Sequence, residues 1–163
     1  MKGARYVEDA CYVFSATGTT ARTAKALAAE LGADLSEIKP AASYTAADLN
    51  WNDDGSRSSR GANDASARPE LAAAPGDMSG YDTILVGFPI WWYVAPKLLD
   101  TWVEAAAPQL AGKRVVTWAT SGGSGMGRTT AVLAKLAPAA NWVDGKVLRG
   151  DRDARAWAAG LGL

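Results

Sequence analysis

The sequence predicts an α/β fold in which a parallel sheet lies between two layers of helices. Two observations support this prediction. Short apolar runs alternate with segments whose apolar residues recur at helical spacing, and strands separated by helices pair in parallel through right-handed crossovers. The chain has 163 residues, of which 48% are hydrophobic, and this length suits one domain with a sizeable core. We therefore expect residues 1–163 to form a single domain.

The first part of the chain supplies two expected strands and one helix. Ala10–Ser15 is a short apolar run and is predicted to be a buried strand. Ala21–Leu31 repeats apolar residues at helical spacing, and Gly32 is expected to end this helix. Ala33–Ile38 alternates apolar and polar residues, which indicates an outer strand.

The second part of the chain is expected to supply three strands and three helices. Asp82–Phe88 is bulky and apolar enough to be a strand buried on both faces. Lys97–Ala106 gathers its apolar residues on one side and is predicted to be a helix. The same patterns predict strands at Lys113–Thr120 and Trp142–Gly150, and helices near Arg128–Ala137 and at Asp153–Leu163.

One segment interrupts this alternation. Asn50–Gly80 is rich in Asp, Ser, Gly, Arg and Ala, and Trp51 and Leu71 are nearly its only large apolar residues. The segment is either a flexible surface insertion or a lid, because long loops in compact domains often cover functional sites. Both interpretations stay open at this point.

The composition excludes several classes of function. Seventeen basic and seventeen acidic residues cancel, so no charge surplus points to nucleic acid or to a membrane surface. The chain has no histidine, which removes Ser-His and Cys-His nucleophile pairs and nearly every zinc site. No signal peptide or membrane-spanning run is visible. The single cysteine, Cys11, cannot form an internal disulfide, which suits a reducing compartment. A cytoplasmic protein is therefore expected.

Ligands of parallel sheets bind beyond the carboxyl ends of the strands, and the first of three unusual loops there is Ser15–Thr20. It has four hydroxyls around a glycine, which exceeds what a helix cap requires. The free N–H groups and the dipole at a helix start favour an anion. We predict that this turn holds a phosphate, with simple capping as the alternative.

The second loop, Gly87–Pro96, has three consecutive aromatic residues after a buried strand: Trp91, Trp92 and Tyr93. Not all three side chains can point into the core, and an exposed aromatic cluster usually contacts a ligand or partner. A flat ring system is the predicted ligand. Packing beneath the long insertion is the alternative.

The third loop, Thr120–Thr129, is rich in glycine, and its small residues leave N–H groups for the polar edge of a flat heterocycle. It also contains Gly122-x-x-x-x-Gly127-Arg128-Thr129, which is one residue away from a loop that binds nucleoside triphosphates. Arginine stands where that loop needs lysine. Together the three loops predict one ligand with a phosphate at one end and a ring at the other.

These motifs resemble those of the flavodoxin family, in particular its "PIWW" type of flavoprotein. "SATGTT" is similar to the family's phosphate loop for FMN at every fixed position. "GFPIWW…AP…TW" and "TSGGSG" resemble the segments after its third and fourth strands, and "SRS" and "SARPEL" resemble the insertion of that branch. The resemblance covers nearly the whole chain. It implies a flavodoxin-like sheet of five parallel strands in the order 2-1-3-4-5, and FMN as the cofactor.

Carried over to this chain, the resemblance implies three groups of FMN-binding residues. The phosphate would be held by Ser15, Thr17, Gly18, Thr19 and Thr20. One side of the isoalloxazine would be lined by Pro89, Ile90, Trp91, Trp92 and Tyr93. Its pyrimidine edge would meet the amides of Ser121, Gly122, Gly123 and Ser124. A likeness of the aromatic segment to flavin quinone reductases favours Trp92 and Tyr93 as ring contacts, although Tyr93 stands where the "PIWW" branch has glycine.

The resemblance implies a protein that transfers electrons through bound FMN. Because the flavin carries the redox chemistry, we expect no catalytic side chain and no bound metal. Two roles stay open. One is a carrier that docks on a redox partner protein; such carriers tend to be acidic, whereas this chain is neutral. The other is a reductase that takes hydride from NAD(P)H for a quinone or related small-molecule acceptor, with Arg57, Arg60 and Arg68 placing positive charge at the mouth of the site. A flavin-free binding module and a P-loop-like nucleotide binder are the weaker alternatives.

Overall fold

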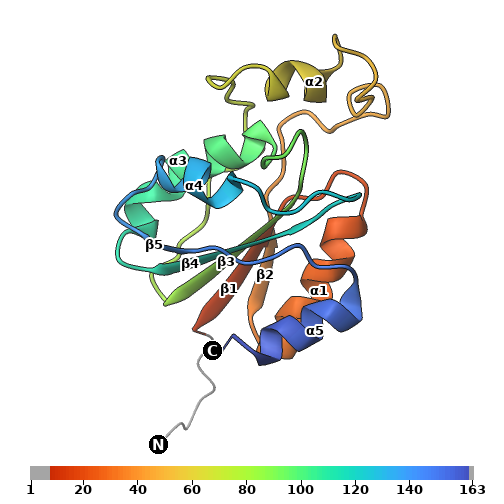
Figure 1. The fold of residues 1–163 in the computed structure, drawn as a ribbon. Coiled ribbons are helices and arrows are strands. Elements are labelled where there is room, and N and C mark those ends of the chain that lie inside the picture. Colours follow the sequence, from red (N-terminus) through yellow and green to blue (C-terminus); the bar gives the residue numbers. More distant parts are fainter. Residues whose placement is uncertain (1–7, 162–163) are drawn as a thin grey trace, which may run out of the picture.

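The structure is a computed structural model that describes residues 8–161. Its strands are β1 (Asp9–Val13), β2 (Asp34–Glu37), β3 (Thr83–Pro89), β4 (Arg114–Thr120) and β5 (Asn141–Val143). Its helices are α1 (Thr19–Leu31), α2 (Arg57–Ala62), α3 (Lys97–Leu110), α4 (Thr129–Ala134) and α5 (Asp151–Ala159). The sheet lies between two layers of helices (Figure 1), so the predicted α/β fold is confirmed.

The five strands form one parallel sheet in the order β2-β1-β3-β4-β5. This is the order that the resemblance implied. The chain runs from β1 to the edge strand β2 and then crosses back to β3 on the other side of β1. The strand order therefore reverses between β1 and β3, and in open α/β sheets ligands bind beyond the carboxyl ends at such a point.

The two faces of the sheet have separate cores. The core under α3 and α4 contains Ile84, Val86 and Phe88 of β3, and the core under α1 and α5 contains Leu85. Successive side chains of a strand point to opposite faces, so a central strand between two helical layers must be apolar on both sides. This explains the bulky composition of β3. By contrast, all four residues of β2 are exposed, as an outer strand allows.

Several elements begin or end at residues that differ from the predictions. β1 ends at Val13 rather than Ser15, α3 continues to Leu110, and α4 spans only Thr129–Ala134. α5 begins at Asp151 and ends at Ala159, while the predicted end of this helix at Leu163 lies outside the described residues. Helix and strand ends depend on local hydrogen bonds that periodicity does not report.

The largest difference is in the last strand, which was predicted over Trp142–Gly150. β5 ends at Val143, and pairing with β4 resumes only around Val147, where the Leu148 N–H donates to the Ala119 carbonyl at 2.7 Å. Between these points the backbone of Gly145 packs against β4: a Cβ at this position would lie 1.7 Å from the Thr117 carbonyl oxygen. The strand is interrupted because the chain bulges here, and only glycine fits.

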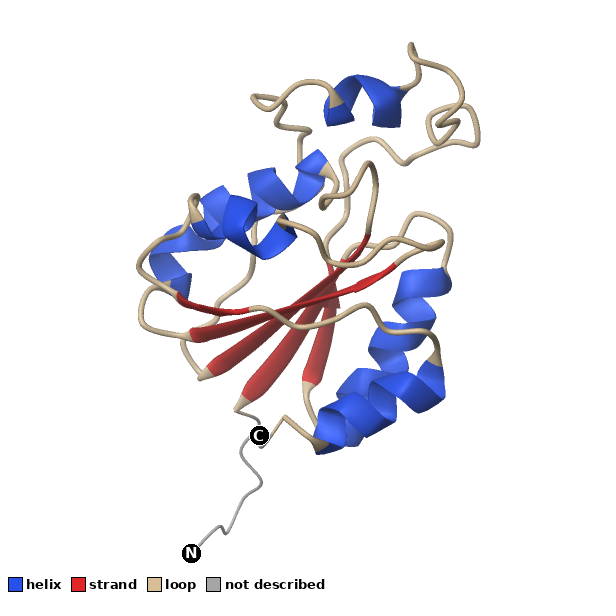
Figure 2. Cartoon of the chain, viewed as in Figure 1, coloured by secondary structure: helices blue, strands red, loops and turns tan. Residues whose placement is uncertain are grey.

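The insertion Asn50–Gly80 contains a short helix, α2, that the sequence patterns did not predict. Ser56 caps it: its hydroxyl accepts a hydrogen bond from the Ser59 N–H at 3.3 Å, and Ser56, Ser58 and Ser59 are buried. α2 and the loops beside it lie beyond the carboxyl edge of the sheet (Figure 2). The insertion therefore lies at the end of the sheet where a ligand is expected.

Candidate functional site

The turn between β1 and α1 presents the start of a helix beyond the sheet. Gly18 is the N-cap residue with a φ of 97°, a conformation that glycine adopts without strain. The Ser15 hydroxyl accepts a hydrogen bond from the Gly18 N–H at 3.1 Å, so Ser15 stabilises the turn itself. None of the described side chains makes a capping hydrogen bond at the start of α1. The first N–H groups of the helix are therefore available to an anion.

Two threonines of this turn have different surroundings. Thr17 is exposed. Thr20 is buried, and its hydroxyl lies 2.7 Å from the hydroxyl of Thr120 at the end of β4. This hydrogen bond links the first loop to the third. Thr20 therefore has a structural role whether or not it also contacts a ligand.

The aromatic segment forms a tight turn after β3. The Trp91 N–H donates to the Val94 carbonyl at 2.9 Å, and the Val94 N–H donates back at 3.2 Å. Between them, Trp92 and Tyr93 have φ values of 55° and 68°. Two consecutive residues with positive φ are characteristic of a type I′ turn, which favours Asn and Gly at these positions. The glycine of the "PIWW" branch would suit the conformation that Tyr93 adopts.

The three aromatic side chains are buried to different degrees. Trp91 is partly buried and packs edge-on against Phe14 and Tyr44, with ring centroids 5.7 and 5.2 Å apart. Trp92 is 43% exposed and Tyr93 is 74% exposed. As expected, the cluster is not wholly part of the core. Trp91 supports the turn, and its two neighbours are available to a ligand.

The strain in this turn yields a stability prediction. Tyr93→Gly should be about 1 kcal/mol more stable than Tyr93→Ala, because alanine keeps the Cβ that opposes a positive φ. Both variants remove the same exposed side chain, so the difference isolates the backbone. Urea unfolding of both variants without ligand measures the difference between their free energies of unfolding. Equal stabilities, or a more stable alanine variant, would show that the backbone at residue 93 is not strained.

The third loop is organised around one hydroxyl. The Ser121 hydroxyl accepts hydrogen bonds from the N–H groups of Gly123 at 3.2 Å and Ser124 at 2.9 Å, and it lies 2.8 Å from the Ser124 hydroxyl. Two of the four amides predicted to meet the ring edge are therefore already engaged within the loop. The N–H groups of Ser121 and Gly122 make no hydrogen bond to another described residue, so they are the better donors.

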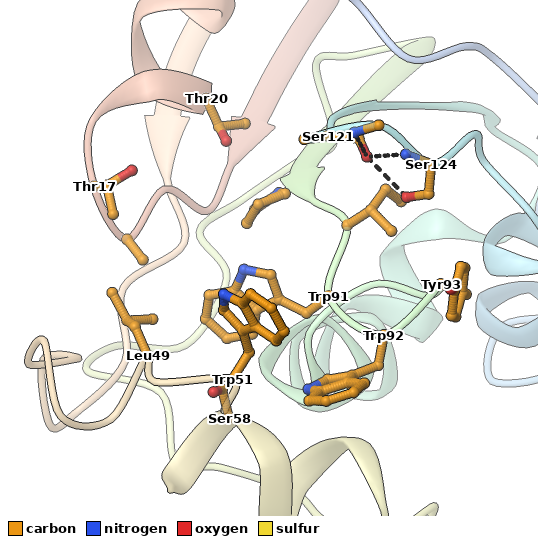
Figure 3. Close-up of a pocket in the computed structure, with 15 residues that line it drawn as sticks. Thr17, Thr20, Leu49, Trp51, Ser58, Trp91, Trp92, Tyr93, Ser121 and Ser124 are labelled. Carbon is orange, nitrogen blue, oxygen red and sulfur yellow. Dashed lines mark hydrogen bonds between the residues drawn. The ribbon is translucent and has the colours of Figure 1, made fainter. Parts of the chain in front are cut away.

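These loops and the insertion line one cavity of about 490 Å³ (Figure 3). Its size is within the range of small-molecule and cofactor sites. Of the predicted site residues, eleven line it: Thr17, Thr20, Pro89, Ile90, Trp91, Trp92, Tyr93, Ser121, Gly122, Gly123 and Ser124. Ser15, Gly18 and Thr19 do not. Thr19 instead lines a neighbouring groove with Arg22 and Arg149.

The sequence patterns missed four residues that line the cavity: Ala16, Leu49, Trp51 and Ser58. Ala16 lies inside the predicted phosphate turn. The other three belong to the insertion or the segment just before it. Two signals were available: Trp51, a large apolar residue in a polar segment, and the "SRS" motif, which contains Ser58. Neither shows by itself what the side chain contacts.

None of the 15 residues that line the cavity is Asp, Glu, Lys or Arg. The part of the phosphate turn that lines the cavity therefore offers N–H groups and hydroxyls but no cation, whereas the neighbouring groove beside Thr19 contains Arg22 and Arg149. A ring bound in this cavity would contact only uncharged side chains and backbone groups of the lining residues. Both features follow from the small and aromatic residues of the three loops.

Arg57 and Arg68, which were expected to carry charge to the mouth of the site, do not line the cavity and have partners within the protein. The Arg57 guanidinium donates to the Ala42 carbonyl at 2.7 Å and lies 3.8 Å from the centre of the Tyr44 ring. Burial raises the pKa of Tyr44, and the Arg57 charge partly opposes this effect. Arg57 thus attaches the insertion to the segment after β2.

Arg68 makes a second attachment, on α3. Its guanidinium pairs with Glu104 and lies 3.8 Å from a carboxylate oxygen of the buried Asp100. Burial raises the pKa of Asp100, while nearby Lys97 and Arg68 lower it. Arg60 is exposed and does not line the cavity. Arginines in a polar insertion suggested ligand binding, but two of them instead hold the insertion to the domain.

The triphosphate-loop alternative for Thr120–Thr129 lacks a required feature. In such loops the final hydroxyl coordinates magnesium, whereas the Thr129 side chain is fully buried at the start of α4.

No group of three or more metal-binding side chains occurs among residues 8–161. Within the same residues, no helix has the length and apolarity needed to cross a bilayer.

Comparisons with known proteins agree with this fold. A family profile described as flavodoxin matches residues 10–159. Two solved structures assigned to the flavoproteins are similar over nearly the whole chain. One, from Bacteroides eggerthii, is 42% identical, covers 96% of this chain and 98% of its own, and has a TM-score of 0.86. The other, from Bacteroides uniformis, is 40% identical, covers 95% and 99%, and has a TM-score of 0.88.

A more distant structure shares the fold. A flavoprotein from Lactobacillus acidophilus, solved in complex with FMN, is 20% identical, covers 93% of this chain and 99% of its own, and has a TM-score of 0.70. The comparison with curated proteins finds no match. The family match over most of the chain, together with the two Bacteroides structures, shows that this chain belongs to the flavodoxin family.

Proposed function

We propose that this protein binds FMN in the cavity between its three loops and transfers electrons through it. The observation that carries the proposal is the arrangement of the cavity: the start of α1 adjoins one end, and an exposed aromatic turn lines another part. Membership of the flavodoxin family and the FMN-bound structure from Lactobacillus acidophilus support the choice of FMN. The single, buried Cys11 suits a reducing compartment such as the cytoplasm.

The residues at the start of α1 fit a phosphate. Gly18 has no atom within 4 Å of an ideal Cβ position, so the turn is open to a ligand. The N–H groups at the helix start and the Thr17 hydroxyl would donate to phosphate oxygens. These donors are neutral, and the helix dipole adds a favourable field. The turn would thus bind and orient the cofactor through neutral donors.

The aromatic turn and the third loop fit the ring. Trp92 and Tyr93 would contact the flat face or edge of the isoalloxazine, and the free amides of Ser121 and Gly122 would meet its polar edge. FMN supplies electron transfer, while the protein binds it, orients it and limits its contact with water. No side chain of the cavity is needed as a proton donor of its own.

The reductase role is the second candidate. The neutral balance of the chain favours it over an acidic carrier. Arg57 and Arg68 do not line the cavity, so their positions do not support the proposed dinucleotide contact. Anaerobic titration of the FMN-loaded protein separates the two roles. We expect dithionite to reduce bound FMN reversibly. Reduction by NADPH or NADH would indicate a reductase, and reduction only by a flavodoxin reductase would indicate a carrier. Failure to bind FMN at one equivalent would contradict both.

Replacing Trp92 tests the ring contact. Trp92→Ala should brighten the fluorescence of bound flavin and weaken FMN binding by about 1 kcal/mol, because one aromatic contact is lost. Fluorescence titration measures both effects. Trp157→Phe, in α5 on the opposite face of the sheet, is the matched control and should change neither. If Trp92→Ala behaves like this control, Trp92 does not contact the ring.

A further inference from the structure

A second concave region lies next to the cofactor cavity, where α1 and α5 begin. It is a groove of about 540 Å³, and the two helices whose first residues line it lie side by side (Figure 1). The lining residues are Thr19, Arg22, Thr23, Thr120, Ser121, Leu148, Arg149, Gly150 and Asp151. Ser121 lines both the groove and the cavity, so the two adjoin just beyond the end of β4.

Two arginine side chains give this groove the positive charge that the cavity lacks. Arg22 of α1 and Arg149, which precedes α5, are both exposed. Among residues 8–161, the arginines whose guanidinium groups pair with a carboxylate or a backbone carbonyl are Arg57 and Arg68. A guanidinium presents its donors in a planar fork that matches a phosphate group. The groove therefore suits a ligand that carries phosphate.

One carboxylate shares the groove with these arginines. Asp151 lines it, whereas the Asp153 carboxylate in the same turn is engaged by the Arg149 N–H at 2.9 Å and by Lys146 at 3.4 Å. A carboxylate repels phosphate but accepts hydrogen bonds from ribose hydroxyls, as acidic residues do in dinucleotide sites. The groove thus offers donors to a phosphate and an acceptor to a sugar. Inorganic phosphate would use only the first of these, and a nucleotide would use both.

We propose that this groove binds the nucleoside diphosphate part of a reduced nicotinamide dinucleotide, with Arg22 and Arg149 on the phosphates and Asp151 on a ribose hydroxyl. The inference rests on the proposed function and gives its reductase candidate a donor site that Arg57 and Arg68 do not provide. A volume of about 540 Å³ suits a ligand part of this size. The two guanidinium charges would also offset repulsion between the dinucleotide and the FMN phosphate at the neighbouring Ser15–Thr20 turn.

The adjoining cavity lets the nicotinamide end of such a ligand approach the flavin. The dinucleotide would give a hydride to FMN and solvent would give a proton. The nicotinamide is then oxidised, and FMN has gained two electrons and two protons. The groove residues bind and orient the donor and take no part in this electron balance.

Calorimetric titration of the oxidised, FMN-loaded protein tests the groove without turnover. The probes are ADP and inorganic pyrophosphate, which share a diphosphate and differ in the nucleoside. We expect ADP to bind more tightly than pyrophosphate. The double variant Arg22→Gln/Arg149→Gln should weaken both probes about tenfold. Asp151→Asn should weaken ADP about fivefold without weakening pyrophosphate, because only ADP has a ribose.

The double variant Arg152→Gln/Arg155→Gln is the matched control. It removes two exposed charges from α5, and neither residue lines the groove, so it should bind ADP like the wild type. An equal loss of ADP affinity in the control would mean that general surface charge attracts the probe, and the groove would not be the site. Equal binding of ADP and pyrophosphate by the wild type, or no ADP binding with FMN in place, would also overturn the proposal.

Anaerobic flavin reduction adds a second readout. Arg22→Gln/Arg149→Gln should slow the reduction of bound FMN by NADH or NADPH about tenfold at a subsaturating dinucleotide concentration, and the rate with dithionite should be unchanged. An unchanged dinucleotide rate, or no reduction of the wild type by either dinucleotide, would overturn the proposal. A loss of FMN affinity in this variant with riboflavin unaffected would assign the arginines to the FMN phosphate instead. If the wild type bound no FMN, the proposed function would fail, and ADP titration of the same variants would still test the groove.

Discussion

Riboflavin is expected to bind this protein at least about a hundredfold more weakly than FMN. The two ligands differ only by the phosphate, and the start of α1 offers it N–H groups that no side chain caps. Two charge-assisted hydrogen bonds, each contributing about 1.5 kcal/mol, give a difference of about 3 kcal/mol, which corresponds to this ratio. Fluorescence titration of the apoprotein with each ligand measures it. Comparable affinities would mean that the Ser15–Thr20 turn only begins a helix.

Threonine variants locate the phosphate contacts within this turn. Thr17→Ala should weaken FMN by about 1–3 kcal/mol, because an exposed hydroxyl that lines the cavity is lost. Thr19→Ala is the matched control: Thr19 lines the neighbouring groove, so a smaller loss is expected. Thr20→Ala also removes the hydrogen bond to Thr120 and should lower stability as well as affinity. Riboflavin binding should be unchanged in the Thr17→Ala variant. If this variant lost as much affinity for riboflavin as for FMN, Thr17 would not contact the phosphate.

Gly145→Ala is expected to destabilise the protein by about 3 kcal/mol. The added methyl group would lie 1.7 Å from the Thr117 carbonyl oxygen and 3.0 Å from the Trp157 ring. A carbonyl in a central strand cannot move without disturbing the sheet, so the bulge after β5 has to shift. In a chain of this size, that loss lowers the melting temperature by roughly 6–12 °C.

Thermal unfolding of the apoprotein measures the effect of Gly145→Ala, and Gly80→Ala is its control. Gly80 has no atom within 4 Å of an added Cβ and does not have a positive φ, so its replacement should change stability little. If the two variants unfold at similar temperatures, the close approach of Gly145 to β4 does not constrain the fold.

Local sequence patterns were enough to predict the α/β fold and the location of the three loops. The apolar run of β3 and the helical spacing in α1 are local patterns, and they follow directly from burial on both faces of a sheet and on one face of a helix. The hydroxyl-rich turn, the aromatic run and the glycine-rich loop follow β1, β3 and β4. Since parallel strands end at one edge of a sheet, these loops had to meet there.

Local patterns could not predict how the Asn50–Gly80 insertion and the last strand are arranged, because both depend on contacts between distant parts of the chain. Arg57 contacts Ala42 and Tyr44, Arg68 pairs with Glu104, and Trp51 joins a cavity wall formed mainly by distant loops. The bulge at Gly145 depends in the same way on Thr117 of the neighbouring strand. None of these partners lies within a few residues along the chain. Hydrophobic periodicity describes which face of an element is buried, whereas the role of an exposed arginine or tryptophan depends on which remote groups the fold brings beside it.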